Sequence, residues 1–295
     1  GHDIGMTFVA CACCGAALQW QGDYACCDGC GLWQSRLTPQ ILHAAAWQQL
    51  DESARGEALQ ALRLHNFALV LERLAAISGS QRGDLLDVGA AHGWFVSRAR
   101  HAGYNSKGLE PDPRLARWAR EHGAVVREGF FPDVLDATEQ FDVLVFNDVF
   151  EHLPAPQTAL QACARHLRAD GLLVLNLPLA SGFFFGLSIA LLRVGFTPPW
   201  QRLWQTGFPS PHLFFFQSRH LERLAQAAGF TLVSESALPS LSTTGLWARL
   251  RMDRSQPLWL HVLVWPLLVL VAPLVRILPN DIGLFIFRKQ QHFGG

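Results

Sequence analysis

The stretch DLLDVGAAHGWF, residues 84–95, decides the fold. It begins with an apolar run typical of a buried strand, passes through a turn of small residues and ends in a segment that favours a helix. Small residues at such a turn let the backbone approach a ligand closely, at the edge where open α/β sheets bind their ligands. The spacing Gly89-x-Ala91-x-Gly93 lacks the longer interval of dinucleotide-binding turns, which disfavours a nicotinamide-binding domain.

Strand and helix patterns alternate from this stretch onward. Apolar strands separated by helices are typical of a parallel sheet with helices on both faces, so the predicted fold class is α/β. The expected strands span residues 85–89, 107–111, 124–129, 141–147 and 172–178, and the helices between them are expected to begin at Trp94, Pro113 and Pro156.

The composition bears on partners and location. The chain has 295 residues, half of them apolar, and its 24 Lys and Arg balance 24 Asp and Glu. Because nucleic-acid binding depends on an excess of basic charge, this neutral total disfavours a nucleic-acid partner. Residues 1–5 resemble a leader left by recombinant expression, and the residues after them lack the pattern of a secretory signal, which predicts a cytoplasmic protein.

Six of the seven cysteines lie within the first 30 residues, and the form CxxCG occurs at residues 11–15 and again at 27–31. The two-residue spacing lets both sulfurs of a pair face one metal, and the glycine permits the tight turn. We therefore expect a zinc ribbon over residues 6–36. Cys13 and Cys26 are adjacent thiols that could compete as ligands if the pairs were taken in another register. A disulfide framework is disfavoured in a cytoplasmic chain. The predicted ligands of a structural zinc ion are Cys11, Cys14, Cys27 and Cys30.

A helical linker, residues 37–80, is expected between the ribbon and the main domain of residues 81–295. Thr38 and Pro39 fit a helix start, with the threonine as N-cap and the proline in the first turn. Apolar residues then recur at helical spacing up to Ile77, which predicts two helices.

Four stretches, in this order, resemble the class I S-adenosylmethionine-dependent methyltransferases, in particular bacterial small-molecule enzymes similar to the ubiquinone-pathway O-methyltransferases. The stretches are LLDVGAAHG at 85–93, FDVLVFNDVFEHL at 141–153, DGLLVLNLP at 170–178 and PHLFFFQSRHLERLAQAAGF at 211–230. The resemblance implies a Rossmann-like sheet of seven strands, in which residues 230–238 form the sixth strand and residues 283–290 an antiparallel seventh.

The resemblance also implies S-adenosylmethionine as the cofactor. An acidic side chain at the end of the second strand can accept hydrogen bonds from both ribose hydroxyls. His92 stands where the family often has threonine, and Ala91 replaces a frequent glycine. The residues that the resemblance places at the cofactor are Asp87, Gly89, Ala91 and Gly93 around the methionine part, Glu110 at the ribose, Gly129 and Phe130 beside the adenine, and Asn147 beside the sulfonium.

The segment NDVFEHLP, residues 147–154, offers a catalytic group. Asp148, Glu151 and His152 are similar to the Glu-x-x-Glu-His arrangement with which ubiquinone-pathway enzymes bind a divalent cation. A cation there would polarise an acceptor hydroxyl, whereas His152 could instead act as general base. In a third interpretation, Glu151 and His152 only orient the following loop. His212 is a second candidate base, with packing against the sheet as its alternative.

Two apolar insertions, residues 179–210 and 241–280, follow the fifth and sixth strands. Both strands end at the edge that carries the small-residue turn, so both insertions are expected at the rim of the site. The run LWLHVLVWPLLVLVAPLVRIL, residues 258–278, is too interrupted by polar residues and prolines for a simple span. We expect it to dock on an anionic membrane surface or to form a lid or dimer contact.

The resemblance and the insertions together predict methyl transfer to an oxygen or carbon of a small, amphiphilic or lipid-linked acceptor at the cytoplasmic face of a membrane. Positioning would supply most of the catalysis, because the sulfonium is already activated. Two alternatives stay open. Some rRNA guanine methyltransferases join an N-terminal zinc finger to this fold, and a scaffold could bind the cofactor without catalysis. A homo-oligomer is compatible with each.

Overall fold

The computed structural model describes residues 10–41, 52–79, 82–240 and 278–291, together with positions 262, 265, 266 and 269. The expected leader, residues 1–5, and most of the second apolar insertion lie outside these residues. The interpretation of residues 258–278 as a membrane-docking segment, lid or dimer contact therefore stays a prediction.

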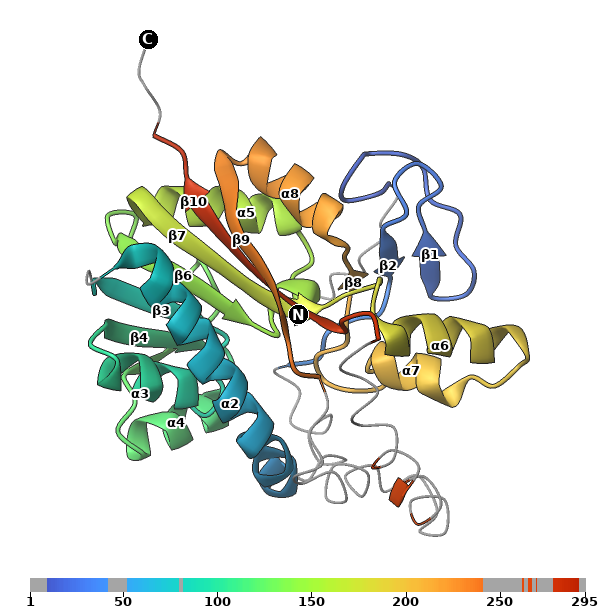
Figure 1. The fold of residues 1–295 in the computed structure, drawn as a ribbon, viewed down its shortest axis with the longest axis horizontal. Coiled ribbons are helices and arrows are strands. Elements are labelled where there is room, and N and C mark those ends of the chain that lie inside the picture. The colour runs from blue at the N-terminus through green and yellow to red at the C-terminus, as the bar shows by residue number, and fades with distance from the viewer. Residues whose placement is uncertain are drawn as a thin grey trace.

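A seven-stranded sheet forms the main domain, in the order β5–β4–β3–β6–β7–β10–β9 (Figure 1). The first five strands in this order pair in parallel, whereas β10 pairs antiparallel with β7 and β9. The Rossmann-like fold and the antiparallel last strand are thus confirmed. The strands are β3 (Asp84–Val88), β4 (Asn105–Glu110), β5 (Val126–Glu128), β6 (Phe141–Asn147), β7 (Leu167–Pro178), β9 (Phe230–Leu238) and β10 (Ile282–Lys289).

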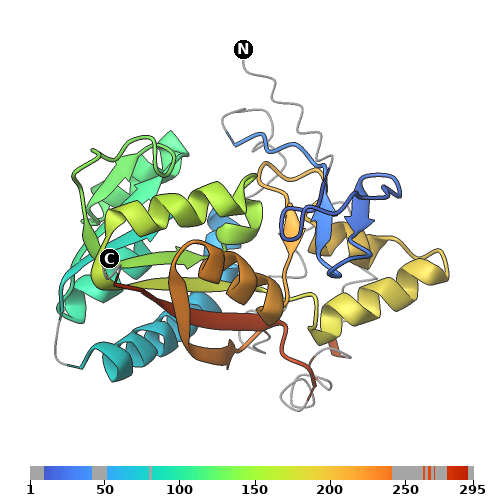
Figure 2. The same ribbon diagram turned by 90° about the horizontal axis from the view of Figure 1, so that it is seen from above.

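Helices cover both faces of the sheet (Figures 1 and 2). Successive side chains of a strand point to opposite faces, so the apolar runs in β6 and β7 contribute side chains to two separate cores. In β6, Val143 and Val145 pack in one core, while Leu144 and Phe146 pack in the other. The helices on the first face are α2 (Glu52–Ser78), α3 (Trp94–His101) and α4 (Pro113–Glu121), and those on the second are α5 (Pro156–His166) and α8 (Ser218–Ala227).

The three predicted helix starts in the main domain are confirmed, since α3, α4 and α5 begin at Trp94, Pro113 and Pro156. The prediction of a helix that starts at Thr38 is wrong. Residues 36–40 have no regular structure, because the chain is tied to a distant loop: the Gln40 N–H donates to the carbonyl of Pro209 at 2.7 Å. Within the described part of the linker, α2 is the helix that forms.

The ribbon is joined to the main domain in one small lobe. Its hairpin, β1 (Tyr24–Cys26) and β2 (Trp33–Ser35), continues into a three-stranded sheet, because β8 (Phe214–Phe215) pairs antiparallel with β2. The first apolar insertion supplies α6 (Phe183–Arg193) and α7 (Pro198–Leu203), which lie beside this sheet (Figure 2). We call β1, β2, β8, α6 and α7 the ribbon lobe.

Aromatic side chains form the core of the ribbon lobe. Trp200 contacts both Tyr24 and Trp33 of the ribbon, at ring-centroid distances of 5.3 and 5.2 Å. The apolar face of the first insertion is therefore buried against the ribbon. At the far end of the hairpin formed by α6 and α7, Val194 and Phe196 remain exposed. Among the described helices, none has the length and hydropathy that crossing a bilayer requires.

Candidate active site

A cavity of about 380 Å³ lies at the carboxyl ends of β3, β4 and β6 and is also lined by the loop between α7 and β8. Its size falls in the range of small-ligand pockets. We call the part lined by the ends of β3, β4 and β5 the cofactor half, and the part beyond β6 the acceptor half. The cofactor half is lined by Gly89, Ala91, His92, Glu110, Gly129 and Phe130, and the acceptor half by Pro39, Ile41, Arg63, Asp148, His152, Gln205, Phe208, Pro209 and Ser210.

The turn after β3 is held in a conformation that suits glycine. Gly89 has φ 74°, and a Cβ there would lie 2.5 Å from Val149 Cγ2. The N–H groups of Gly89 and Ala90 both donate to the Leu109 carbonyl at 2.8 Å, which anchors the turn to β4. Gly93 lies behind the cavity lining, packed against Ala124. The turn thus presents backbone, with little side chain, to the cofactor half.

Glu110 is fixed at the end of β4 by two backbone groups. The N–H of Ala91 donates to Oε2 and the N–H of Asp112 donates to Oε1, both at 2.8 Å. A carboxylate oxygen can accept more than one hydrogen bond, so the oriented carboxylate can still receive a diol at the cavity surface. This geometry suits the ribose position that the sequence assigned to Glu110.

Two predicted cofactor residues, Asp87 and Asn147, lie beneath the cavity and outside its lining. Asn147 Nδ2 donates to Asp87 Oδ1 at 3.2 Å, and Asn176 Nδ2 donates to Asn147 Oδ1 at 3.3 Å. Burial raises the pKa of Asp87 to about 8, with the Asn147 hydrogen bond opposing the shift and the charge of Glu110 adding to it. These side chains form a polar floor that supports the turn.

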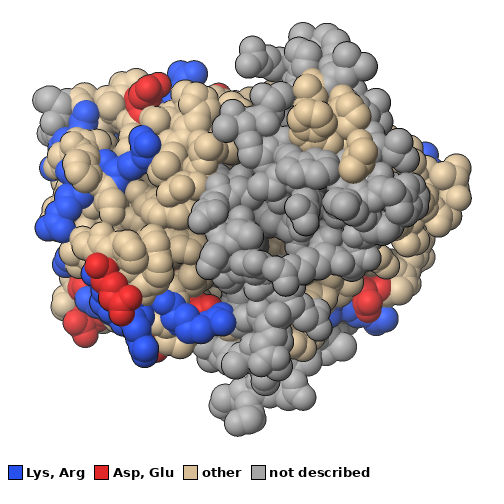
Figure 3. Space-filling view, turned by 90° about the horizontal axis from the view of Figure 1, so that it is seen from below, with Lys and Arg blue, Asp and Glu red and all other residues tan. Residues whose placement is uncertain are grey.

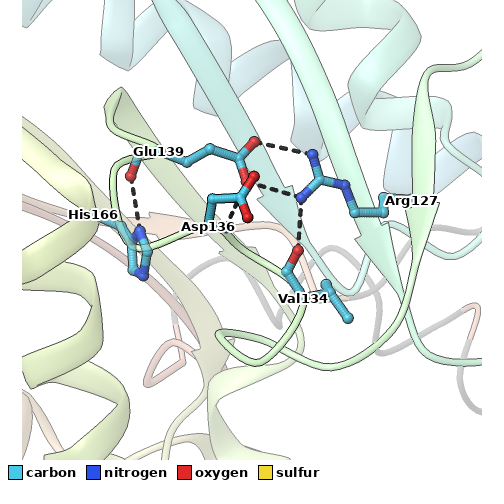
Figure 4. Close-up of polar contacts among 5 residues, drawn as sticks. All are labelled: Arg127, Val134, Asp136, Glu139 and His166. Carbon is cyan, nitrogen blue, oxygen red and sulfur yellow. Dashed lines mark hydrogen bonds and ion pairs between the residues drawn. The ribbon is translucent and has the colours of Figure 1, made fainter.

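The segment that carries Gly129 and Phe130 is held by an ion pair at its base (Figure 4). Arg127 contacts both carboxylate oxygens of Glu139, at 2.8 and 3.0 Å, and also donates to the Val134 carbonyl at 2.7 Å. His166 of α5 lies 2.8 Å from the Glu139 carbonyl through Nδ1. These contacts close the loop between β5 and β6 and so set the outer wall of the cofactor half.

Three ionisable side chains meet at the acceptor half, where His152 lines the cavity and Glu151 and His212 lie behind it. Glu151 and His152 lie in the short 3-10 helix η1 (Phe150–His152), and His212 precedes β8. Nε2 of each histidine lies 3.8 Å from Glu151 Oε1. Glu151 is fully buried, and no described residue hydrogen-bonds to either of its carboxylate oxygens. Burial raises its pKa well above the ordinary range, and the charge of Asp148 raises it further.

Hydrogen bonds fix the orientation of the two imidazoles. His152 Nδ1 lies 2.8 Å from the Pro211 carbonyl, which only accepts, so Nδ1 carries the proton and Nε2 is the basic nitrogen of the neutral ring. Gln205 Nε2 lies 3.0 Å from His212 Nε2, and an amide nitrogen donates. The basic nitrogen of His152 therefore lies beside Glu151 Oε1, and His152 also lines the cavity.

Comparison with known proteins identifies the family to which the chain belongs. The sequence profile of the family described as "Methyltransferase domain" matches residues 59–235. The chain belongs to the methyltransferase domain family. An uncharacterised methyltransferase of Mycolicibacterium vanbaalenii is 31% identical over 149 residues, which are 48% of this chain and 58% of that protein. The chain spans about half the length of the curated relatives that it matches.

Solved structures share the fold of this methyltransferase domain at low identity. A cyclopropane synthase of Mycobacterium tuberculosis has a TM-score of 0.54 and 19% identity, covering 85% of this chain and 96% of that chain. The 1,6-didemethyltoxoflavin-N1-methyltransferase of Burkholderia thailandensis, with S-adenosylhomocysteine bound, has a TM-score of 0.50 and 16% identity, covering 89% and 97%.

The methyltransferase domain places residues at the cavity that the sequence did not single out. Arg63 of α2 is the one described Lys or Arg in the lining, and Gln205 comes from the loop after α7. Neither lies in a motif, because each reaches the cavity only through packing of its helix or loop. Conversely, Asp148 lines the cavity but is not part of the close group of Glu151, His152 and His212.

The four predicted ribbon ligands come together in the structure. The Sγ atoms of Cys11 and Cys30, and those of Cys14 and Cys27, are each 3.5 Å apart, and all four lie within 4.8 Å of one another. Zn–S bonds of about 2.3 Å require sulfurs roughly 3.8 Å apart in a tetrahedron, so the cluster fits zinc. All are free thiols. With four protein ligands, such a site would be structural.

Proposed function

We propose that this protein transfers the methyl group of S-adenosylmethionine to an oxygen or carbon of a small acceptor. The observation that carries the proposal is one cavity whose lining joins the small-residue turn and Glu110 to His152, behind which Glu151 and His212 lie buried. Family membership supports it, as does S-adenosylhomocysteine in a protein of similar fold. S-Adenosylmethionine would supply an activated methyl group, which leaves this chain to position and deprotonate the acceptor.

The cofactor half would hold S-adenosylmethionine. Glu110 would accept hydrogen bonds from the ribose, and Phe130 beside Gly129 would cover the adenine. Arg63, which the sequence had not singled out, lines the adjoining acceptor half, from which its cation could pair with the methionine carboxylate. The turn at Gly89 and Ala91 would contact the methionine part through its backbone.

In the acceptor half, His152 would accept the proton of the acceptor at Nε2. S-Adenosylmethionine would supply the methyl group to the acceptor oxygen or carbon and would leave as its neutral thioether, S-adenosylhomocysteine. In its ionised form Glu151, whose Oε1 lies 3.8 Å from that same nitrogen, would stabilise the imidazolium formed. General-base catalysis of this kind contributes about 10²- to 10⁴-fold to a rate.

Binding of a divalent cation is the second role that the group of Glu151, His152 and His212 would suit. Two imidazoles and one carboxylate within 4.8 Å of one another are a donor set for a nitrogen-preferring cation such as zinc or iron. In that case Glu151 and His152 would bind it together with His212, which takes the place that the sequence had assigned to Asp148. The cation would polarise an acceptor hydroxyl.

Apolar surface favours an amphiphilic acceptor and contact with a membrane. Phe208 and Pro209 line the acceptor half, and Val194, Phe196 and Trp265 are exposed elsewhere. We propose peripheral docking on the cytoplasmic face of an anionic membrane, with exposed Arg193 suiting its headgroups. Flotation with anionic liposomes tests this. A double variant, Val194→Asp with Phe196→Asp, should float less than the wild type, and equal flotation would exclude this surface.

An RNA acceptor is less well supported. In Figure 3 acidic side chains lie among the basic ones along the lower left of the described surface, so this part has no continuous basic area. Binding to RNA rests on such areas and weakens steeply with salt, so a salt-independent failure to bind RNA would exclude this alternative. The scaffold alternative predicts cofactor binding without turnover.

Label transfer from S-[methyl-³H]adenosylmethionine into the aqueous and lipid phases of a bacterial cell extract tests the function. Wild-type protein should label one phase. His152→Gln should lower the rate about 10²- to 10⁴-fold while the affinity for S-adenosylhomocysteine is unchanged. His101→Gln, at an exposed position of α3, is the matched control. Cofactor binding without label in any phase would overturn the proposal, and elemental analysis decides whether a second metal is present.

A further inference from the structure

The ribbon strand β2 reaches the acceptor half through Ser35. This serine is fully buried, and its Oγ donates to the carbonyl of His212 at 2.7 Å. Its backbone N–H donates to the Leu213 carbonyl at 2.8 Å, and the Leu213 N–H donates in turn to the Glu151 carbonyl at 2.9 Å. A continuous line of hydrogen bonds therefore runs from the ribbon to two members of the imidazole–carboxylate group.

The same strand is tied to the predicted zinc site. The N–H of Ala12, inside the first knuckle, donates to Gln34 Oε1 at 2.8 Å. In the second knuckle the Cys27 N–H donates to the Leu32 carbonyl at 2.9 Å, just before β2 begins. Since Gln34 and Ser35 are neighbours in β2, few bonds separate the knuckles from the carbonyl of His212.

The position of the His212 backbone decides where its ring lies. The His212 and His152 rings are 4.7 Å apart, and Phe215 lies against His212 at 5.2 Å. At such short range, a shift of the His212 backbone changes its distance to Glu151 Oε1 directly. Displacements of about 1 Å in a catalytic group can cost roughly 100-fold in rate.

We propose that Ser35 is a positioning residue, through which the ribbon sets the place of His212 against Glu151 and His152. The ribbon then supports the acceptor half from behind its lining, through the backbone of residues 212 and 213. The role of this half in catalysis rests on the proposed function, whereas the placement of His212 does not. The bonds of Ser35 run to residues 212 and 213 rather than to the turn after β3, so the cofactor half should not respond.

Three variants separate this role from simple stabilisation of the ribbon. Ser35→Ala removes the Oγ donor, and Ser35→Thr restores a hydroxyl at the same strand position. Gln157→Ala is the matched control, because Gln157 Nε2 also ties the main domain to the first knuckle, at the Ala12 carbonyl, 2.9 Å away. The Gln157 bond does not involve the β2–β8 pairing.

The readouts are the ring ¹⁵N signals of His212 in histidine-labelled full-length protein, assigned with His212→Gln, together with zinc content, affinity for S-adenosylhomocysteine and label transfer. We expect Ser35→Ala to shift the His212 signals and lower label transfer about 10- to 100-fold, with zinc content and cofactor affinity kept. Ser35→Thr should return both toward the wild type.

Unchanged His212 signals in Ser35→Ala, or an equal shift in Gln157→Ala, would overturn the proposal. If the wild type transfers no label, the proposed function fails, and the ring signals still decide whether Ser35 positions His212. Loss of zinc from Ser35→Ala would show that the serine acts only by stabilising the ribbon, which also contradicts the proposal.

Discussion

The two halves of the cavity are assembled in different ways. The cofactor half is made of turns that directly follow β3, β4 and β5, and its shape rests on backbone geometry at Gly89 and on the two N–H groups that hold Glu110. The acceptor half is made of side chains from segments far apart in the chain, and Ser35 of the ribbon holds one of them. The cofactor half therefore depends on local chain geometry, whereas the acceptor half depends on tertiary contacts. A substitution that disrupts one half should leave the other half intact.

Removing the predicted zinc ion should have the largest effect, on the ribbon lobe and, through it, on the acceptor half. Structural zinc in small cysteine sites contributes on the order of 10–16 kcal/mol to folding. Chelation of the intact protein should therefore abolish the near-ultraviolet circular dichroism of the ribbon lobe, whose core holds Tyr24, Trp33 and Trp200. Affinity for S-adenosylhomocysteine, measured by calorimetry, should change little.

Two cysteine variants provide the control for this experiment. Cys27→Ser removes a ligand of the four-sulfur group, whereas Cys26→Ser changes its neighbour outside the group. Zinc content should fall in the first and be retained in the second. Loss of cofactor affinity in step with zinc would mean that the two halves are one unit and do not fail separately.

Gly89→Ala should break the cofactor half alone. Alanine is strained at φ 74°, and its Cβ would lie 2.5 Å from Val149 Cγ2. A strain of about 1–3 kcal/mol corresponds to roughly 5- to 150-fold weaker binding of S-adenosylhomocysteine. Gly186→Ala in α6, where a Cβ meets no atom within 4 Å, is the control. Equal affinities of both variants would show that the cofactor half does not depend on the backbone geometry of this turn.

Asp87→Asn should change how stability depends on pH. Burial raises the folded-state pKa of Asp87 to about 8, so between roughly pH 4 and 8 the folded state binds more protons than the unfolded state. Wild-type stability should fall as pH rises through this window, by up to ~1.4 kcal/mol per unit from this group. The asparagine variant should lack that slope in urea unfolding without cofactor. If the free energy of unfolding depended on pH in the same way in both proteins, the raised pKa of Asp87 would be contradicted.

Arg127→Gln should have the smallest effect. The ion pair with Glu139 is partly exposed, with 43% and 22% of the two side chains accessible, and such pairs contribute about 0–1 kcal/mol. Because the pair closes the loop that carries Phe130, the variant should weaken cofactor binding by no more than about tenfold and leave the His212 ring signals unchanged. A change in those signals would show coupling between the halves through the loop.

The order of strands and helices could be predicted because it depends on local patterns. Apolar runs, small-residue turns and prolines at helix starts predicted the sheet, and Gly89, Ala91 and Glu110 lie in the cavity lining at the strand ends where those patterns place them. The spacing of the two cysteine pairs likewise predicted a cluster that forms.

The acceptor half could not be predicted to the same extent. His212 joins Glu151 because β8 pairs with the ribbon, and no spacing in the sequence encodes that pairing. Asp148 is near Glu151 in sequence, yet its φ of 54° turns the chain, and His212 takes its place in the close group. Thr38 matched a helix start, but bonding of Gln40 to Pro209 prevailed over that local preference.

Pairing of β2 with β8 also bears on the order in which the molecule folds. The register joins Trp33 to Phe215 and Gln34 to Phe214, so the ribbon emerges from the ribosome long before its third strand exists. Closing so long a loop lowers the chain entropy before the stabilising contacts of the paired strands have formed. Non-local strand pairing is therefore slow. A nascent chain that ends before residue 212 carries all four metal ligands and the Gly89 turn but lacks His212. The residues of the cofactor half are thus synthesised before the group of Glu151, His152 and His212 is complete.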